Sequence, residues 1–156
     1  MSDHAEAFLQ AGIPEPAACS RTLGFQLLEM DVKAGTARVR FDGKTDFLNP
    51  MGTVQGGYLA AMLDDVMGMM AILVLKGRAV ASTIDLHIHY LRPVRPGPIE
   101  VEARITNKGP TILFAEAQLY DMRGKPAAKA TAALAVTPVR SGAAAKTQTN
   151  ESSGSE

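Results

Sequence analysis

Two adjacent aspartates lie in the middle of the most apolar stretch of the chain. Asp64 and Asp65 fall within residues 58–75, a run in which Ala, Leu and Met dominate, and all three are strong helix formers. Burying a carboxylate is unfavourable unless the group is paired, hydrogen-bonded or protonated. At least one of these acids is therefore a candidate for chemistry. The alternative is that one aspartate caps a neighbouring loop while the other reaches solvent.

Helical spacing favours Asp64 as the functional acid. Residues at steps of four and three lie on one face of a helix. The face that includes Asp64 otherwise carries only small residues: Gly57, Ala61, Gly68 and Ala71. Another backbone or a ligand can approach such a face closely, and Asp64 lies at its centre. Asp65 is turned away by about 100°.

The start of the expected helix also carries groups that could take part in chemistry. The first N–H groups of a helix have no partner within it, and they carry partial positive charge that suits an anion or a polarised carbonyl oxygen. Gly56 and Gly57 leave the backbone bare at this point, and Asn49 and Gln55 offer amide donors nearby. A carboxylate about two turns further on has the placement of a base or nucleophile facing an oxyanion site. A glycine-rich turn into a core helix is the alternative.

This stretch resembles the signature of a known family. The pattern N-P-x-G-x-x-Q-G-G, followed after six residues by Asp, is similar to that of the hotdog-fold acyl-CoA thioesterases of the PaaI (phenylacetate-degradation) type. Five residues match the family pattern, namely Asn49, Gly52, Gly56, Gly57 and Asp64, whereas Gln55 stands where the family usually has His. The resemblance extends over roughly residues 22–138. It implies an α+β fold, in which a curved antiparallel sheet wraps around one long central helix.

The resemblance also implies hydrolysis of an acyl-CoA thioester. The carbonyl oxygen would lie against the N–H of Gly57, beside Gly56, with Gln55 assisting. Asp64 of a partner subunit would act as general base or as nucleophile, in a homodimer or homotetramer whose active site lies at the subunit interface. Because a Gln side chain only donates and accepts hydrogen bonds, Gln55 cannot serve as an acid or base.

Further roles are carried over from the family onto two other segments. Asn49 and Thr83 would position the attacking water, Thr83 being the small hydroxyl residue near the start of the strand that follows the helix. Arg92 and Arg95 lie on a proline-rich turn that spans residues 91–98. Two arginines on such a turn are a plausible site for the phosphates of coenzyme A, and a solvated turn is the alternative.

The elements that must position these residues follow from the alternation of apolar and polar side chains. A hairpin is expected over residues 23–41, and later strands over residues 80–91, 99–106, 111–120 and 127–136. The one long apolar helix must cover one face of that sheet. Residues 1–21 form a separate arm with a short helix near residues 3–11, residues 22–140 form the domain, and residues 141–156 are expected to be disordered.

In the strand over residues 80–91, strict alternation places Thr83, Asp85, His87 and His89 on one side and Ile84, Leu86, Ile88 and Tyr90 on the other. His87 and His89 suggest a metal pair only weakly, and we expect them to be polar residues on the outer or interface face of the sheet.

Composition excludes several other classes of protein. The chain has 156 residues, which suits one domain. Its 16 basic and 16 acidic residues balance, so the chain has no overall positive charge that would attract nucleic acid. The single cysteine excludes an internal disulfide framework, and the histidine spacing predicts no metal site and no metal cofactor. No signal peptide is evident, and two charges at the centre of the apolar helix argue against a membrane span. We therefore expect a cytoplasmic protein that binds neither membrane nor nucleic acid and needs no cofactor.

Two other functions remain open at this point. A hotdog domain can bind acyl-CoA without turning it over and act as a sensor, and the Gln in place of His favours this alternative. A hydratase or dehydratase is less compatible, because those enzymes pair an acid with a His and the helix region holds none. The sequence does not name the acyl group: aromatic and medium-chain acyl groups both fit.

Overall fold

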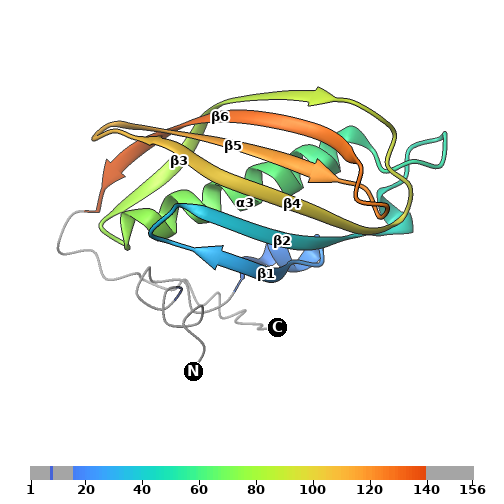
Figure 1. Ribbon diagram of the computed structural model, residues 1–156, viewed down its shortest axis with the longest axis horizontal. Coiled ribbons are helices and arrows are strands. Elements are labelled where there is room, and N and C mark those ends of the chain that lie inside the picture. The colour runs from blue at the N-terminus through green and yellow to red at the C-terminus, as the bar shows by residue number, and fades with distance from the viewer. Residues whose placement is uncertain (1–7, 9–15, 140–156) are drawn as a thin grey trace, which may run out of the picture.

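The computed structural model describes Phe8 and residues 16–139. Six antiparallel strands form one sheet: β1 (Gln26–Asp31), β2 (Thr36–Gly43), β3 (Ala79–Tyr90), β4 (Gly97–Lys108), β5 (Ile112–Tyr120) and β6 (Pro126–Pro138). Their order across the sheet is β1-β2-β4-β5-β6-β3. The helical elements are α2 (Ala18–Thr22), the short 3-10 turn η1 (Thr45–Phe47) and the long α3 (Gly56–Leu75). The curved sheet lies over α3, which covers one of its faces (Figure 1). These features are those of the predicted α+β hotdog architecture.

The predicted hairpin, central helix and four later strands all form. Most of the expected arm lies outside the described residues, as does the tail over residues 141–156. The part of the arm that is described includes the start of α2, a helical turn that the sequence pattern did not predict.

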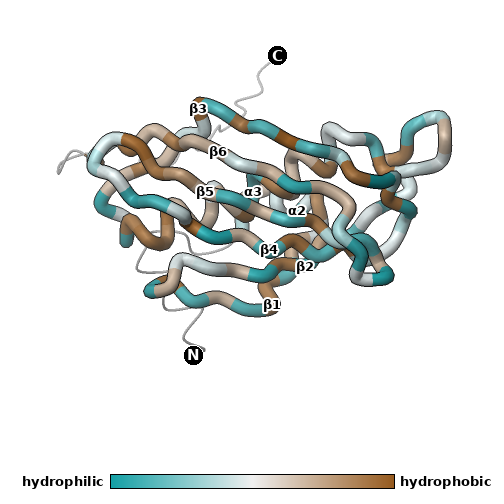
Figure 2. Tube along the Cα trace, turned by 45° about the horizontal axis from the view of Figure 1, so that its top comes forward, coloured by the Kyte–Doolittle hydropathy of each residue, from teal (hydrophilic) through white to brown (hydrophobic). Residues whose placement is uncertain are grey.

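The hydrophobic core lies between α3 and the inner face of the sheet. Along α3 the fully buried side chains include Met62, Leu63, Val66, Met67 and Met70. Along β4 the buried residues Ile99, Val101 and Ala103 alternate with more exposed ones, as period-2 patterning requires. Figure 2 shows this alternation of hydrophilic and hydrophobic segments along the strands. Within the described residues α3 is the one helix long and apolar enough to cross a membrane, and it lies packed against the sheet as a core helix.

A row of four alanines crosses the middle of the inner face. Ala37, Ala103, Ala117 and Ala130 are direct neighbours on β2, β4, β5 and β6. All four are buried. Alanine is a poor strand former. Its presence here indicates that small side-chain volume, rather than strand propensity, determines which residue occupies these positions. Small side chains leave the space that a helix packed over the sheet requires.

The two ends of α3 are closed by different side chains. At the start, Gln55 is the N-cap, and its side chain accepts a hydrogen bond from the N–H of Gly57. At the end, Lys76 adopts the left-handed conformation with φ of 54°, and Gly77 follows with φ of 67°. The sequence predicts that Lys76 complements the negative end of the helix. The cation that contacts a carbonyl there is Lys108 of β4, whose Nζ donates to the Val74 oxygen at 2.6 Å.

One prediction for β3 is wrong. Strict alternation places Thr83 on the same face as His87 and His89. However, the pairing of β3 with β6 contains a bulge between Thr83 and Asp85, so Ile84 is an extra residue. A bulge interrupts the alternation of faces and can redirect a side chain. Thr83 therefore faces α3, while His87 and His89 project from the outer face of the sheet.

Candidate functional site

Asp64 is a half-buried carboxylate held by a hydroxyl. The Oγ1 of Thr83 donates a hydrogen bond of 2.9 Å to its Oδ1. The bulge in β3 makes this contact possible, because it turns Thr83 toward the helix. The small-residue face around Asp64 is open: Ala61 is exposed, and a Cβ added at Gly68 would meet no atom within 4 Å. The structure thus brings together Asp64 and Thr83, two of the residues proposed from the sequence, and the carboxylate can be reached from outside the chain.

Asp65, its neighbour, has a structural contact instead. The hydroxyl of the buried Ser20 in α2 donates to Asp65 Oδ1 at 2.8 Å. The second carboxylate oxygen, Oδ2, is buried without a hydrogen-bond partner. Burial raises the pKa of the Asp65 carboxyl, the hydrogen bond from Ser20 opposes this rise, and the nearby charge of Asp64 adds to it. Asp65 thus ties α2 to α3, which fits the structural role considered for one of the two acids.

The turn before α3 is held together by Asn49. Its Oδ1 accepts from the backbone N–H groups of Met51 and Thr53, at 3.0 and 3.2 Å, and its Nδ2 donates to Thr53 Oγ1 at 2.9 Å. Self-hydrogen-bonding of this kind is a common way for Asn to fix a turn. Asn49 therefore shapes the loop that leads into the helix, and its amide already has partners within that loop.

The Gly57 N–H, which is the donor expected to face an oxyanion, already makes a hydrogen bond within the chain. Gln55 Oε1 accepts from the Gly57 N–H at 2.6 Å. On the other side of the helix start, the hydroxyl of Tyr90 donates to the Gly56 carbonyl oxygen at 2.8 Å. The Tyr90 ring lies 3.3 Å from the point that a Cβ of residue 56 would occupy, so a side chain at Gly56 would press on it. Tyr90 was not predicted as a site residue from the sequence. Its position at the end of a strand face that points to the helix could have identified it.

The two predicted arginines lie on an exposed loop next to the same turn. The loop between β3 and β4 is anchored by the buried Val94, whose carbonyl oxygen accepts from the Val54 N–H at 2.8 Å. Arg92 and Arg95 flank this anchor, and both are exposed. The fold therefore brings both cations to the side of the molecule where α3 begins.

These residues form two groups along α3. Gly57 and Asp64 are seven positions apart in the sequence, which corresponds to about 10 Å along the helix axis. A carbonyl oxygen bound at the Gly57 N–H and the carboxylate of Asp64 in the same chain are thus too far apart to act on one carbonyl carbon. One group contains the helix start and the arginines, and the other contains Asp64 and Thr83.

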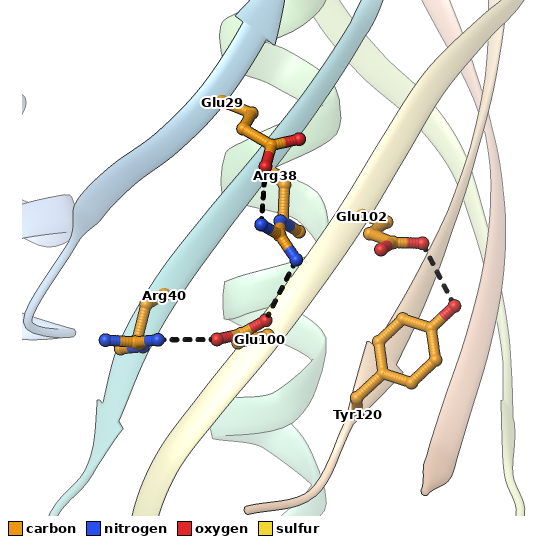
Figure 3. A network of polar contacts seen from close by, with 6 residues as sticks. All are labelled: Glu29, Arg38, Arg40, Glu100, Glu102 and Tyr120. Atoms are coloured by element: carbon orange, nitrogen blue, oxygen red, sulfur yellow. Dashed lines mark hydrogen bonds and ion pairs between the residues drawn. The ribbon is translucent and has the colours of Figure 1, made fainter. Parts of the chain in front are cut away.

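A separate cavity of about 780 Å³ lies on the outer face of the sheet, away from Asp64. It reaches from Glu29 on β1 to His87 and His89 on β3. Side chains on this face are extensively ion-paired: Arg38 contacts Glu29 and Glu100, and Arg40 contacts Glu100. In the same region Tyr120 donates to Glu102, as Figure 3 shows. In the part of the chain that the structure describes, no group of three or more His, Cys, Asp or Glu side chains is gathered to hold a metal.

Comparison with known proteins gives concordant similarities. Residues 51–128 match the sequence pattern of the Thioesterase superfamily. A provisionally named esterase of Saccharolobus solfataricus is 30% identical over 109 residues, which cover 68% of this chain and 77% of the relative. Acyl-coenzyme A thioesterase 13 of Mus musculus is 32% identical over 72 residues, so the chain spans about half (51%) of that protein's length.

Among solved structures, a phenylacetic acid degradation-related protein from Ralstonia eutropha is 33% identical. The similarity covers 83% of this chain and 98% of that protein, with a TM-score of 0.76.

Proposed function

Because this chain belongs to the Thioesterase superfamily and has the hotdog fold of the PaaI-like members, we propose that it hydrolyses acyl-CoA thioesters to the free acid and coenzyme A. The observation that carries this proposal is Asp64, a half-buried carboxylate held by Thr83 on the open small-residue face of the central helix. The name of the mouse relative, an acyl-coenzyme A thioesterase, supports the substrate class. The acyl group is proposed to be aromatic or of medium chain length.

In the proposed reaction the thioester carbonyl oxygen takes the place of Gln55 Oε1 at the Gly57 N–H. Both are hydrogen-bond acceptors, so they compete for one donor at the positive end of the helix dipole. Once displaced, the Gln55 side chain can turn its amide N–H toward the same oxygen. Negative charge that develops on this oxygen in the tetrahedral intermediate is then stabilised by donors fixed before the reaction begins.

Asp64 supplies the attacking group in either of two ways. As a general base it removes a proton from water, the hydroxide adds to the carbonyl carbon, and the C–S bond breaks to release the thiolate of coenzyme A. As a nucleophile its carboxylate adds directly, expels the thiolate and forms an anhydride that water then hydrolyses. In both cases the Thr83 hydroxyl orients the carboxylate through its hydrogen bond to Oδ1, and we propose that it also helps to position the water.

The separation of about 10 Å between Gly57 and Asp64 along α3 supports a site that is shared between two chains. We propose a homodimer or homotetramer in which the helix start of one subunit faces Asp64 of another. The exposed small-residue face of α3 permits such an approach. In addition, β3 is an edge strand of the sheet, and unpaired edge strands tend to associate with other chains.

Arg92 and Arg95 are proposed to bind phosphate groups of coenzyme A. Both cations are exposed on the loop beside the helix start, where the thioester would enter. Guanidinium groups bind phosphate oxygens through paired hydrogen bonds, which makes Arg suited to this role.

The test is thiol release from a panel of aromatic and aliphatic acyl-CoAs, with wild type and Asp64→Asn compared side by side. The variant should lose on the order of a hundred- to ten-thousand-fold in kcat, the range expected for a positioned base. Asp65→Asn is the matched control, since it removes the adjacent carboxylate, and it should retain turnover. A loss of less than about tenfold in Asp64→Asn would refute the assignment of Asp64.

The second candidate function is acyl-CoA binding without turnover. It is favoured by one observation, the occupation of the Gly57 N–H by Gln55 Oε1, which leaves this donor unavailable until the side chain moves. Tight binding of acyl-CoA with no thiol release from any member of the panel would support this sensor role over hydrolysis.

A further inference from the structure

Two imidazoles lie in contact on the outer face of the sheet, remote from Asp64. The Nε2 atoms of His87 and His89 are 3.0 Å apart. Both side chains are exposed on β3, and both line the outer cavity. No step of the proposed hydrolysis uses them. Alternating residues of a strand normally project side by side, so the close approach of the two ring nitrogens is a specific geometric feature.

The distance between the nitrogens matches that of two ligands of one metal ion. In the square-planar or octahedral sites of Cu²⁺ and Ni²⁺, two neighbouring imidazole nitrogens bound at about 2.1 Å make a right angle at the metal and lie about 3.0 Å apart. That value is the observed separation.

The ring orientation gives independent support. The ring centroids of His87 and His89 are 4.7 Å apart, and the ring planes are inclined by 68°. With each nitrogen roughly 1.2 Å in front of its ring centroid, two rings meeting head-on in a hydrogen bond would place the centroids about 5.4 Å apart. Two rings that converge at a right angle on a shared cation would place them about 4.7 Å apart. The observed distance agrees with rings that lean toward a common point.

The groups around the pair define what can bind. On β6, Lys129 lies opposite His89 and Thr131 lies opposite His87. Asp85 lies two residues before His87 on the same face of β3, so the pair has an acid on one side and Lys129 on the other. The nearest acid beyond Thr131 is Glu116 on β5, and it is already paired with Arg104. A cation at the imidazoles therefore has two neutral nitrogen ligands, and water fills its remaining positions.

The geometry points to a binding site for a borderline divalent cation, of the class of Ni²⁺ or Cu²⁺, formed by His87 and His89 on the outer face of β3. Imidazole nitrogen is a preferred ligand of these ions, whereas Mg²⁺ and Ca²⁺ prefer oxygen. The open coordination positions face the outer cavity, so the bound ion can accept a further ligand from solvent or from another molecule.

The experiment is calorimetric titration of Ni²⁺ into the full-length chain without any histidine tag. Wild type should bind one ion per chain. His87→Gln and His89→Gln should each weaken binding by at least about tenfold, since a single ligand replaces a chelating pair. His4→Gln removes the third histidine of the chain and should leave binding unchanged.

Lys129→Ala is the more demanding variant, because it alters no ligand. Removal of the facing positive charge should tighten Ni²⁺ binding severalfold, and a purely structural role for the histidines would not produce this effect. The EPR spectrum of the Cu²⁺ complex should also show two coordinated nitrogens that are reduced to one in either histidine variant. Absence of Ni²⁺ binding to wild type, or equal binding by wild type and the double variant His87→Gln with His89→Gln, would overturn the proposal. The contact would then be only a hydrogen bond between the two rings.

Discussion

The distance between Gly57 and Asp64 leads to a quantitative prediction about mixed assemblies. If each active site takes its donor from one chain and its carboxylate from another, two inactive variants should restore each other. Asp64→Asn removes the carboxylate. Gly57→Pro removes the N–H donor, at a first-turn position whose N–H has no partner within the helix. Each variant alone should be nearly inactive.

The recovered activity can be calculated. When equal amounts of the two variants associate at random into two-fold symmetric dimers, about half of the dimers are mixed. In a mixed dimer one site has both defects, and the other pairs an intact Gly57 with an intact Asp64. About a quarter of all sites should therefore be functional, and the mixture should show about a quarter of wild-type thiol release. Pairing of dimers into tetramers does not alter this fraction.

The assay is thiol release after the two variants are unfolded and refolded together, with separately refolded variants mixed afterwards as the reference. Circular dichroism and thermal unfolding of each parent verify that both fold, because proline at residue 57 also restricts the backbone of Gly56. If both parents fold and the co-refolded mixture is no more active than their sum, the composite site is wrong, and the distance argument along α3 fails with it.

Three further predictions concern side chains around α3. Gln55→Ala removes the N-cap contact to Gly57 and should lower the free energy of unfolding by on the order of 1 kcal/mol; an unchanged urea midpoint would contradict this role. Burial raises the pKa of Asp65, so its ionised form destabilises the fold at neutral pH. This penalty diminishes as the pH falls through the folded-state pKa and is absent below the unfolded-state pKa. Asp65→Asn should therefore be more stable than wild type near neutral pH and lose that advantage in acid, as urea unfolding at several pH values would reveal. Arg92→Ala combined with Arg95→Ala should raise KM for acyl-CoA but not for the matching acyl-pantetheine, which lacks the nucleotide phosphates; equal effects on both substrates would count against phosphate binding.

The sequence predicts most of the fold because each element has a local pattern. The hairpin and the later strands alternate with a period of two, and the apolar run before Gly77 is too long to be a strand. The pattern fails at Ile84. An apolar residue there continues the alternation with Leu86 and Ile88, so nothing in the residue types reveals the bulge that separates Thr83 from His87.

The candidate site is predicted only where its residues are neighbours along the chain. Helical spacing is enough to separate Asp64 from Asp65. By contrast, the contact of Ser20 with Asp65 joins residues 45 positions apart, and that of Tyr90 with Gly56 joins residues 34 positions apart. Such contacts depend on how elements pack, and no periodicity encodes them. The occupation of the Gly57 N–H by Gln55 is local, but it follows from a side-chain rotamer that the sequence does not specify.

The bulge at Ile84 divides β3 into two segments of opposite phase. Before it, the side chains that face the helix belong to odd-numbered residues, such as Thr83; after it they belong to even-numbered residues, such as Leu86 and Ile88. A profile of tolerance to charged substitutions along β3 should therefore have a period of two that shifts by one residue at position 84. Deletion of Ile84 would remove the unpaired residue, so the shortened strand should alternate regularly while keeping both the Thr83 contact with Asp64 and the outward projection of His87.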